Sequence, residues 1–271
     1  MYNLTDTHLH SVFSWDARQK PCELAKKAAQ KGLAALCLTE HIDLMDGHQK
    51  NYTKFDYEGY TEECKKASDI FPGFLKGIEA GEVHEYADRF ESFMEGKEFD
   101  YVLGSVHSMA ASSPVFDEYF SKFDTLEDGY RRYFEELYRL ISRGGFDVAA
   151  HLTLVHRQGG RHFKKPVYWT FKQEIDNILK LMVERKIGLE VNTSGLRFPS
   201  HDFVPDRETI AAYLRMGGDI ITVGSDAHKL SDSFLGLEKA YEMLESLGVS
   251  EVTVFKARKP VKVKIRKEQS V

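Results

Sequence analysis

Short apolar runs alternate along the chain with longer stretches in which apolar residues recur every three or four positions. The runs that predict buried strands span residues 4–9, 33–39, 74–80, 101–106, 146–150, 187–191 and 219–223. Helical spacing of apolar residues marks 130–141, 175–182 and 237–247. Strands that alternate with helices favour right-handed βαβ units and therefore a parallel sheet.

The number and spacing of these strands predict an α/β barrel. Seven strands within about 230 residues fit a (β/α) barrel better than two separate domains, and a doubly wound open sheet is the structural alternative. No linker rich in Pro, Gly or Ser divides the chain, so residues 1–271 are expected to form a single domain. Residues 43–56 and 152–166 are expected to be long loops, and the second is a candidate lid or substrate-contacting segment.

Composition narrows the class of protein. The formal net charge of −5 is spread along the chain, which argues against a general nucleic-acid or membrane-surface binder. No apolar run approaches the roughly 18 residues of a membrane span, and no signal peptide is expected. The odd count of three cysteines, without C-x-x-C spacing, is typical of a protein of the reducing cytoplasm. The basic segment 256–267 is interpreted as a strand-like end with a solvated face.

Histidines and acidic residues gather at the C-terminal ends of the predicted strands. They are His8, His10, His41, Glu79, His107, His151, Asp226 and His228. In a parallel barrel these ends share one face, which is where active sites form. The chain therefore directs at least six histidines to one rim.

Neutral imidazole and carboxylate are the usual ligands of Zn, Mn and Fe. The pairs His8/His10 and Asp226/His228 have i, i+2 spacing, so both members can reach one metal. A carboxylate such as Glu79 or Asp226 can bridge two metals, and metals ~3.5–4 Å apart can activate a shared water. A lone histidine is more often a core or surface residue, but two such pairs with further strand-end histidines indicate a metal cluster.

Several motifs of the chain carry a family resemblance. They are DTHLH at 6–10, SWD at 14–16, TEH at 39–41, GIE at 77–79, SVHS at 105–108 and GSDAH at 224–228. In this order they resemble the motifs of the PHP (polymerase and histidinol phosphatase) superfamily. Within it, EVNTSGLR at 190–197, TVFKARKP at 253–260 and the chain length are most similar to the histidinol-phosphate phosphatases.

The resemblance implies a distorted (β/α)7 barrel that holds two or three divalent metal ions, with zinc, manganese and iron as candidates. The implied ligand sets are His8, His10, Glu79 and Asp226 for one metal, Glu79, His107 and His151 for a second, and Asp16, His41 and His228 for a third. Family members often carry an aspartate two residues after the position of His151. This chain has Thr153 there, which puts the contacts around that ligand in doubt.

The resemblance also implies a reaction. A metal-bridging hydroxide would hydrolyse L-histidinol phosphate to L-histidinol and phosphate in histidine biosynthesis, with Asp226, His228 and Arg197 in catalytic positions. Arg197 and Arg157 are candidate phosphate clamps, because a guanidinium fork matches two phosphate oxygens. Glu190 and Asn192 alternate with apolar neighbours and are expected to face the barrel interior.

The expected partner is a small phosphorylated metabolite, and the sequence gives no oligomeric state. The ammonium and imidazole groups of L-histidinol phosphate need an acceptor away from the metals. Glu40, Glu82 and Asp202 are candidates for this acceptor. Two other functions stay open at this point. One is a different PHP-type phosphoesterase, acting on a nucleotide or phosphotyrosine, and the other is a non-catalytic metal-binding domain.

Overall fold

Parallel strands form the centre of the protein, in a computed structural model that describes residues 1–45, 54–109, 113–114 and 117–267. The strands are β1 Thr5–Leu9, β2 Ala35–Asp43, β3 Phe74–Gly81, β4 Tyr101–Ser105, β5 Val148–Ala149, β6 Gly188–Asn192 and β7 Ile221–Gly224. They lie in one sheet in sequence order, each parallel to the next. Each overlaps one of the apolar runs, so the prediction of these seven strands is confirmed.

The sheet curls until its first and last strands meet. A parallel bridge pairs Leu9 with Ala227. The amide of His10 donates to the carbonyl of Ala227 at 3.1 Å, and the amide of Asp226 donates to the carbonyl of His8 at 2.7 Å. The structure is therefore a nearly closed, distorted (β/α)7 barrel, as predicted, and the seam lies between two of the histidine-bearing segments.

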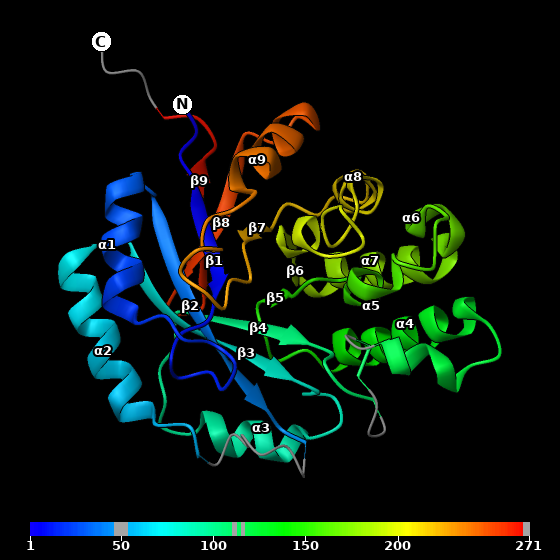
Figure 1. Ribbon diagram of the computed structural model, residues 1–271, viewed down its shortest axis with the longest axis horizontal. Coiled ribbons are helices and arrows are strands. Elements are labelled where there is room, and N and C mark those ends of the chain that lie inside the picture. The colour runs from blue at the N-terminus through cyan, green and yellow to red at the C-terminus, as the bar shows by residue number, and fades with distance from the viewer. Residues whose placement is uncertain (46–53, 110–112, 115–116, 268–271) are drawn as a thin grey trace.

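Helices cover the outside of the barrel, with α1 and α2 at one side and α4 and α7 at the other (Figure 1). The helices are α1 Pro21–Lys31, α2 Tyr57–Ile70, α3 Ala87–Met94, α4 Leu126–Arg143, α5 Leu154–Gly159, α6 Val167–Thr170, α7 Lys172–Arg185, α8 Arg207–Arg215 and α9 Leu237–Ser246, with 3₁₀ turns η2 Asp117–Lys122 and η3 Ser194–Arg197. The apolar faces predicted for α4, α7 and α9 are buried, which confirms them.

Local sequence signals set where these helices begin and end. Pro21 occupies the first turn of α1, and Gly32 ends it with φ +69°, a conformation that glycine adopts without strain. The Thr125 hydroxyl accepts the amide of Asp128 at 3.1 Å and so caps α4. The Asp206 carboxylate caps α8 by accepting the amide of Thr209 at 2.9 Å.

One of the two expected loops differs from the prediction, and most of the other lies outside the described residues. The stretch 152–166 was expected as a long loop, but it contains helix α5, because Leu154 and Val155 are buried and draw the chain against the core. This helix follows β5 directly. In the other stretch, 43–56, strand β2 runs through Asp43, and residues 46–53 lie outside the described part of the chain.

An antiparallel hairpin, β8 Glu251–Lys256 and β9 Lys259–Lys264, packs next to β7. Phe255 of β8 stacks on Tyr101 at the start of β4, with ring centroids 5.2 Å apart, and both are buried. β9 is largely exposed, which agrees with the solvated strand expected at 256–267, whereas β8 was not among the expected strands. Within the described residues, no helix combines the length and the apolar character that crossing a membrane requires.

The Phe255–Tyr101 contact gives the first prediction. Phe255→Ala removes a buried aromatic ring, so the free energy of unfolding should fall by about 3–5 kcal/mol in denaturant titrations. The control is Val261→Ala on β9, where the side chain is 40% exposed and should change stability little. A loss below about 1 kcal/mol for Phe255→Ala would show that the hairpin does not stabilise the barrel.

Candidate metal centre

The first group of side chains lies at the seam between β1 and β7. His8 and His10 alternate along the chain and point to the same side, with their Nε2 atoms 3.2 Å apart. The Asp226 Oδ1 atom lies 3.7 Å from Nε2 of His8 and 3.4 Å from Nε2 of His10. Gly224 makes room for this group, because a Cβ there would come within 2.3 Å of the Cβ of His8.

Glu79, near the end of β3, connects this group to a second one. Its Oε2 atom lies 3.3 Å from Nε2 of His8 and 3.6 Å from Nε2 of His10. Its Oε1 atom lies 3.1 Å from Nε2 of His107, beyond β4, and 2.7 Å from Nε2 of His151, beyond β5. One carboxylate thus turns one oxygen to each of two histidine pairs, as a bridging ligand must.

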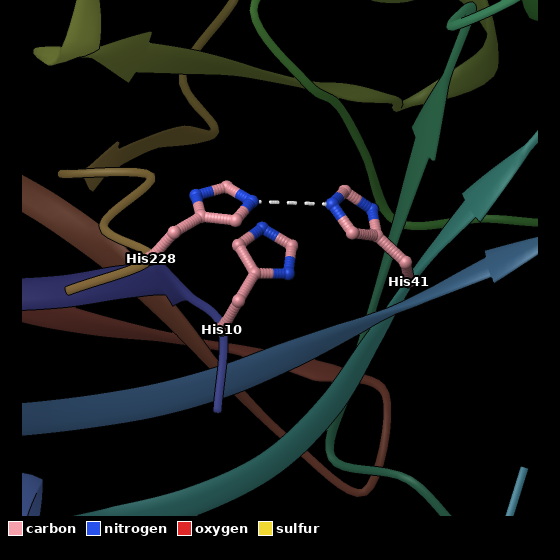
Figure 2. Close-up of side chains that lie close together, drawn as sticks. All are labelled: His10, His41 and His228. Carbon is pink, nitrogen blue, oxygen red and sulfur yellow. Dashed lines mark hydrogen bonds between the residues drawn. The ribbon is translucent and has the colours of Figure 1, made fainter. Parts of the chain in front are cut away.

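A third group joins β2 to the loop after β7. Nε2 of His41 and Nε2 of His228 are 3.3 Å apart, and Figure 2 shows these rings facing each other with His10 beside them. The His10 ring stacks on both, with centroids 4.0 Å from His41 and 4.2 Å from His228. Oδ2 of Asp16 lies 3.6 Å from Nε2 of His41 and 3.3 Å from Nε2 of His228.

The structure brings the side chains of all nine predicted ligands close together, but the groups with the closest ligand atoms cut across the three predicted sets. Sets of three residues with ligand atoms within 4.8 Å of one another include His8/His10/Asp226, His8/Glu79/His151 and His10/His41/His228. Oε2 of Glu79 and Oδ1 of Asp16 are buried and accept no hydrogen bond from described groups. Divalent cations with a nitrogen and oxygen preference fit this donor set.

Electrostatics keep the carboxylates of the centre ionised. Burial acts to raise the pKa of Glu79, but the charges of His107, His8 and His151 hold it well below its ordinary value. Burial also acts to raise the pKa of Asp226, but the charge of His8 and further neighbouring groups hold that pKa well below its ordinary value. The pKa of His10 is well below its usual value because of burial and the neighbouring His41 and His228, so its ring is neutral and carries a free lone pair.

A second layer of buried carboxylates holds the ligands in place. Oε1 of Glu190 accepts the Nδ1 proton of His8 at 2.6 Å, which fixes the ring with its Nε2 atom toward Glu79, His10 and Asp226. Its Oε2 accepts the amide of His151 at 2.7 Å and the side-chain amide of Asn192 at 3.1 Å. Glu190 and Asn192 are fully buried, and Glu190 directly contacts one ligand ring.

Glu40 organises the loop that follows β1. Its carboxylate accepts the amide and hydroxyl of Ser11 and, at 2.5 Å, the hydroxyl of Ser14. The Ser14 hydroxyl lies 3.2 Å from Nδ1 of His10 and accepts the amide of His41 at 3.0 Å. Ser14 therefore links two ligand residues, His10 and His41, and Glu40 holds Ser14.

Glu82 and Asp6 play similar parts at other strand ends. Oε1 of Glu82 accepts the amides of His107 and Ser108 at 2.6 and 2.8 Å. Oδ1 of Asp6 accepts the amide of Ser225 at 2.8 Å. Burial raises the pKa of both carboxyls to about 7. Sequence reasoning offered Glu40 and Glu82 as acceptors for the substrate, but both are buried and already accept hydrogen bonds from backbone amides and serine side chains.

Three residues in or beside the centre have a strained backbone. His151 and Asp226 have φ of +29° and +51°, and Glu82 has φ of +53°. A residue other than glycine in this region costs on the order of 1–3 kcal/mol. The amides of His151 and Asp226 donate to Glu190 and to the carbonyl of His8, so strong hydrogen bonds hold the strained residues in place.

A cavity of about 470 Å³ opens onto the centre. It is lined by Trp15, Asp16, His41, Asp43, Glu79, His107, Ser108, Ser113, His151, Arg157, Asp226 and His228. Arg157, on α5, donates through Nη1 to Oδ2 of Asp226 at 2.8 Å. Arg197, on η3, instead donates through Nη2 to the carbonyl of Ser225 at 2.7 Å, and it is not among the lining residues.

Four lining residues, Trp15, Asp43, Ser108 and Ser113, were not among the site residues predicted from the sequence. Oδ1 of Asp43 accepts the Nδ1 proton of His107 at 3.2 Å. The spacing of His41 and Asp43, at i and i+2 along one strand, is the signal that could have found this carboxylate. Asp202, which was expected as a substrate acceptor, is absent from the described lining of the cavity.

Comparison with known proteins adds relatives of similar length. A probable histidinol-phosphatase of Clostridium acetobutylicum is 29% identical over 91% of this chain and 95% of its own length. The histidinol-phosphatase of Lactococcus lactis is 25% identical over 94% of this chain and 95% of its own length.

A solved structure and a family profile also match this chain. A crystal structure of histidinol phosphate phosphatase from Lactococcus lactis, in complex with zinc, L-histidinol and phosphate, superposes with a TM-score of 0.87. The two chains are 24% identical, and the match covers 96% of this chain and 99% of the other. The sequence profile of the PHP domain matches residues 6–194, which is more than half of the chain. The chain therefore belongs to the PHP domain family.

Proposed function

We propose that this protein is a metal-dependent phosphatase that hydrolyses L-histidinol phosphate to L-histidinol and phosphate. One observation carries the proposal: nine histidine and carboxylate side chains converge at one end of the barrel, and seven of them line the wall of one cavity. The names of the full-length relatives supply the substrate. The Lactococcus structure with a TM-score of 0.87 holds zinc, L-histidinol and phosphate, which supports both the metals and the ligand class.

The proposed ligands are the nine residues of the three sets: His8, His10, Asp16, His41, Glu79, His107, His151, Asp226 and His228. Bound divalent ions would supply Lewis-acid stabilisation of the phosphate oxygens and a water acidic enough to act as nucleophile at neutral pH. The three carboxylates neutralise only part of the charge of two or three such ions, so the centre attracts a phosphate dianion although the chain is acidic overall. Glu190, Glu40 and Glu82 keep the ligand-bearing segments in place.

Arg157 and Arg197 are the proposed phosphate-binding residues, and they lie in different positions relative to the cavity. Arg157 lines the cavity and reaches the outer oxygen of Asp226, so its guanidinium stands next to where a phosphate bound at the centre would lie. Arg197 fixes the carbonyl of Ser225, while its buried Nη1 has no hydrogen-bond partner among described atoms and can offer an N–H to an anion. A guanidinium fork suits this role because it donates two parallel bonds.

The proposal includes the setting of the reaction. The substrate is a small phosphorylated metabolite of histidine biosynthesis, and residues 1–271 act as one domain. Cys22, Cys37 and Cys64 are free thiols, which suits the reducing cytoplasm. Cys37 and Cys64 are buried and serve as packing residues.

The metals give the second prediction. Elemental analysis of the purified protein should find more than one transition-metal ion per chain, and chelation should abolish phosphate release. His8→Ala should lower kcat by several orders of magnitude, because it removes a ligand at the seam between two sets. His162→Ala is the control, since this histidine is exposed and outside the sets. Full activity of metal-free protein would refute the metal-dependent mechanism.

The arginines give the third prediction. Arg157→Lys keeps the charge but loses the fork, so kcat/KM should fall about 10- to 100-fold, as expected for one charge-assisted hydrogen bond of ~1.5–3 kcal/mol. Arg197→Lys should also lower kcat/KM, with metal content unchanged. Exposed Arg215→Lys serves as the control. If Arg157→Lys and Arg157→Ala both keep wild-type kinetics, Arg157 does not bind the phosphate.

The substrate gives the fourth prediction. The value of kcat/KM for L-histidinol phosphate should exceed those for p-nitrophenyl phosphate, nucleoside monophosphates and a phosphotyrosyl peptide by at least tenfold, or ~1.4 kcal/mol of transition-state discrimination. Steady-state phosphate release with each compound measures this preference. A nucleotide or phosphotyrosine substrate that wins by the same margin would keep the metal chemistry and overturn the named reaction.

A further inference from the structure

The substrate proposed above has two groups that the metal centre does not recognise. Besides its phosphate, L-histidinol phosphate carries an ammonium and an imidazole ring. A site that discriminates by polar contacts must pair such groups with partners of its own. The cavity wall should therefore contain an acceptor for the ammonium and a surface for the ring.

One carboxylate of the cavity wall is left over from the ligand sets. Four carboxylates line the described wall, and Asp16, Glu79 and Asp226 belong to the proposed sets. The fourth is Asp43, the last residue of β2. The buried acids outside the wall, such as Glu40 and Glu190, already accept several hydrogen bonds within the protein.

Asp43 is held in position and still has acceptor capacity. Its Oδ1 accepts the Nδ1 proton of His107 at 3.2 Å, and Gly81 makes room for it, since a Cβ at Gly81 would lie 2.9 Å from that oxygen. A carboxylate has about four acceptor positions, so one hydrogen bond from a histidine leaves others available. The side chain is 9% exposed and that exposure lies at the cavity, where an ammonium can reach it.

Trp15 supplies an aromatic surface at the same cavity. Its side chain is 43% exposed, although its neighbours in sequence are fixed: Ser14 donates to Glu40, and Asp16 contacts His41 and His228. The Trp15 ring lines the cavity and lies 6.5 Å from the His41 ring, which places it at the wall. The indole face can stack on an imidazole ring and attracts it further when that ring is protonated.

Trp15 and Asp43 lie near the same part of the centre. The Trp15 ring lies 6.5 Å from the His41 ring, the His41 ring lies 5.2 Å from the His107 ring, and His107 donates to Asp43. Both residues thus adjoin the His41–His107 part of the centre, whereas Arg157 adjoins Asp226. We propose, resting on the proposed function, that Asp43 binds the substrate ammonium and Trp15 stacks on its imidazole, so that these two residues determine specificity.

A different role for Asp43 makes a different prediction. Asp43 also forms a set with His41 and His107 whose ligand atoms lie within 4.8 Å of one another. If Asp43 acted only by holding His107 or a metal, its replacement would slow the hydrolysis of every phosphate ester by the same factor. Binding of an ammonium slows only those esters that carry one.

The fifth prediction uses three esters that differ by one group at a time. They are L-histidinol phosphate, 3-(imidazol-4-yl)propyl phosphate without the ammonium, and L-alaninol phosphate without the ring. Asp43→Asn keeps an acceptor for His107 but loses the charge. It should lower kcat/KM for the two ammonium-bearing esters at least tenfold and change the deamino ester less than threefold.

Trp15→Leu should lower kcat/KM at least fivefold for the two imidazole-bearing esters and leave L-alaninol phosphate within twofold, and Trp15→Phe should recover most of the loss. Asp69→Asn and Trp169→Leu are matched controls, since both residues are exposed and away from the cavity. Metal content of each variant is measured in parallel. Equal losses on all three esters in Asp43→Asn, or no loss in Trp15→Leu, would overturn the assignment of that residue.

The same data separate this inference from the proposed function. If the wild-type protein hydrolyses all three esters equally and another substrate better, the proposed function fails. If the wild-type protein prefers L-histidinol phosphate but the variants lose activity uniformly or not at all, only the roles of Asp43 and Trp15 fail.

Discussion

The structure depends on one electrostatic constraint: Glu79 is a carboxylate with no exposed surface, and the charges of its histidine neighbours hold its pKa well below the ordinary value. Such a group is costly to bury unless charged or hydrogen-bonding partners surround it. Glu79 finds its partners on four other strands or the segments that follow them, in His8 and His10, His41, His107 and His151. Removal of one partner leaves the others with an uncompensated buried charge, so the barrel rim and the centre are stabilised together.

The histidines of the centre explain why several buried acids lie just outside it. Each histidine needs one nitrogen fixed by a donor–acceptor contact so that the other can bind a metal. Glu190 does this for His8, and Asp43 does it for His107. Glu190 also takes the amide of the strained His151, so one side chain fixes both a ring and a backbone. The second layer therefore sets the positions of the ligands.

The sequence was sufficient for the parts that follow from periodicity and strand polarity. Seven apolar runs predicted seven strands, and parallel strands must bring their C-terminal ends to one face, which placed residues as distant as His8 and His228 together. It could not rank Arg157 above Arg197, because which guanidinium enters the cavity depends on the path of η3 and α5. It also missed α5 itself, whose six residues carry too little periodicity to be told from a loop.

The metal ligands and the other cavity residues differ in how easily they can be replaced. The ligands sit on strand ends or on segments tied to them, where a shift of one residue disturbs Glu79 and its partners. Trp15 and Arg157 belong to a loop and a short helix that contact the cavity and can be replaced with the barrel left intact. At 24% identity the Lactococcus fold is retained with a TM-score of 0.87, so the barrel tolerates wide substitution. Substrate preference can therefore vary at these few positions, while the buried charge on Glu79 keeps the metal centre constant.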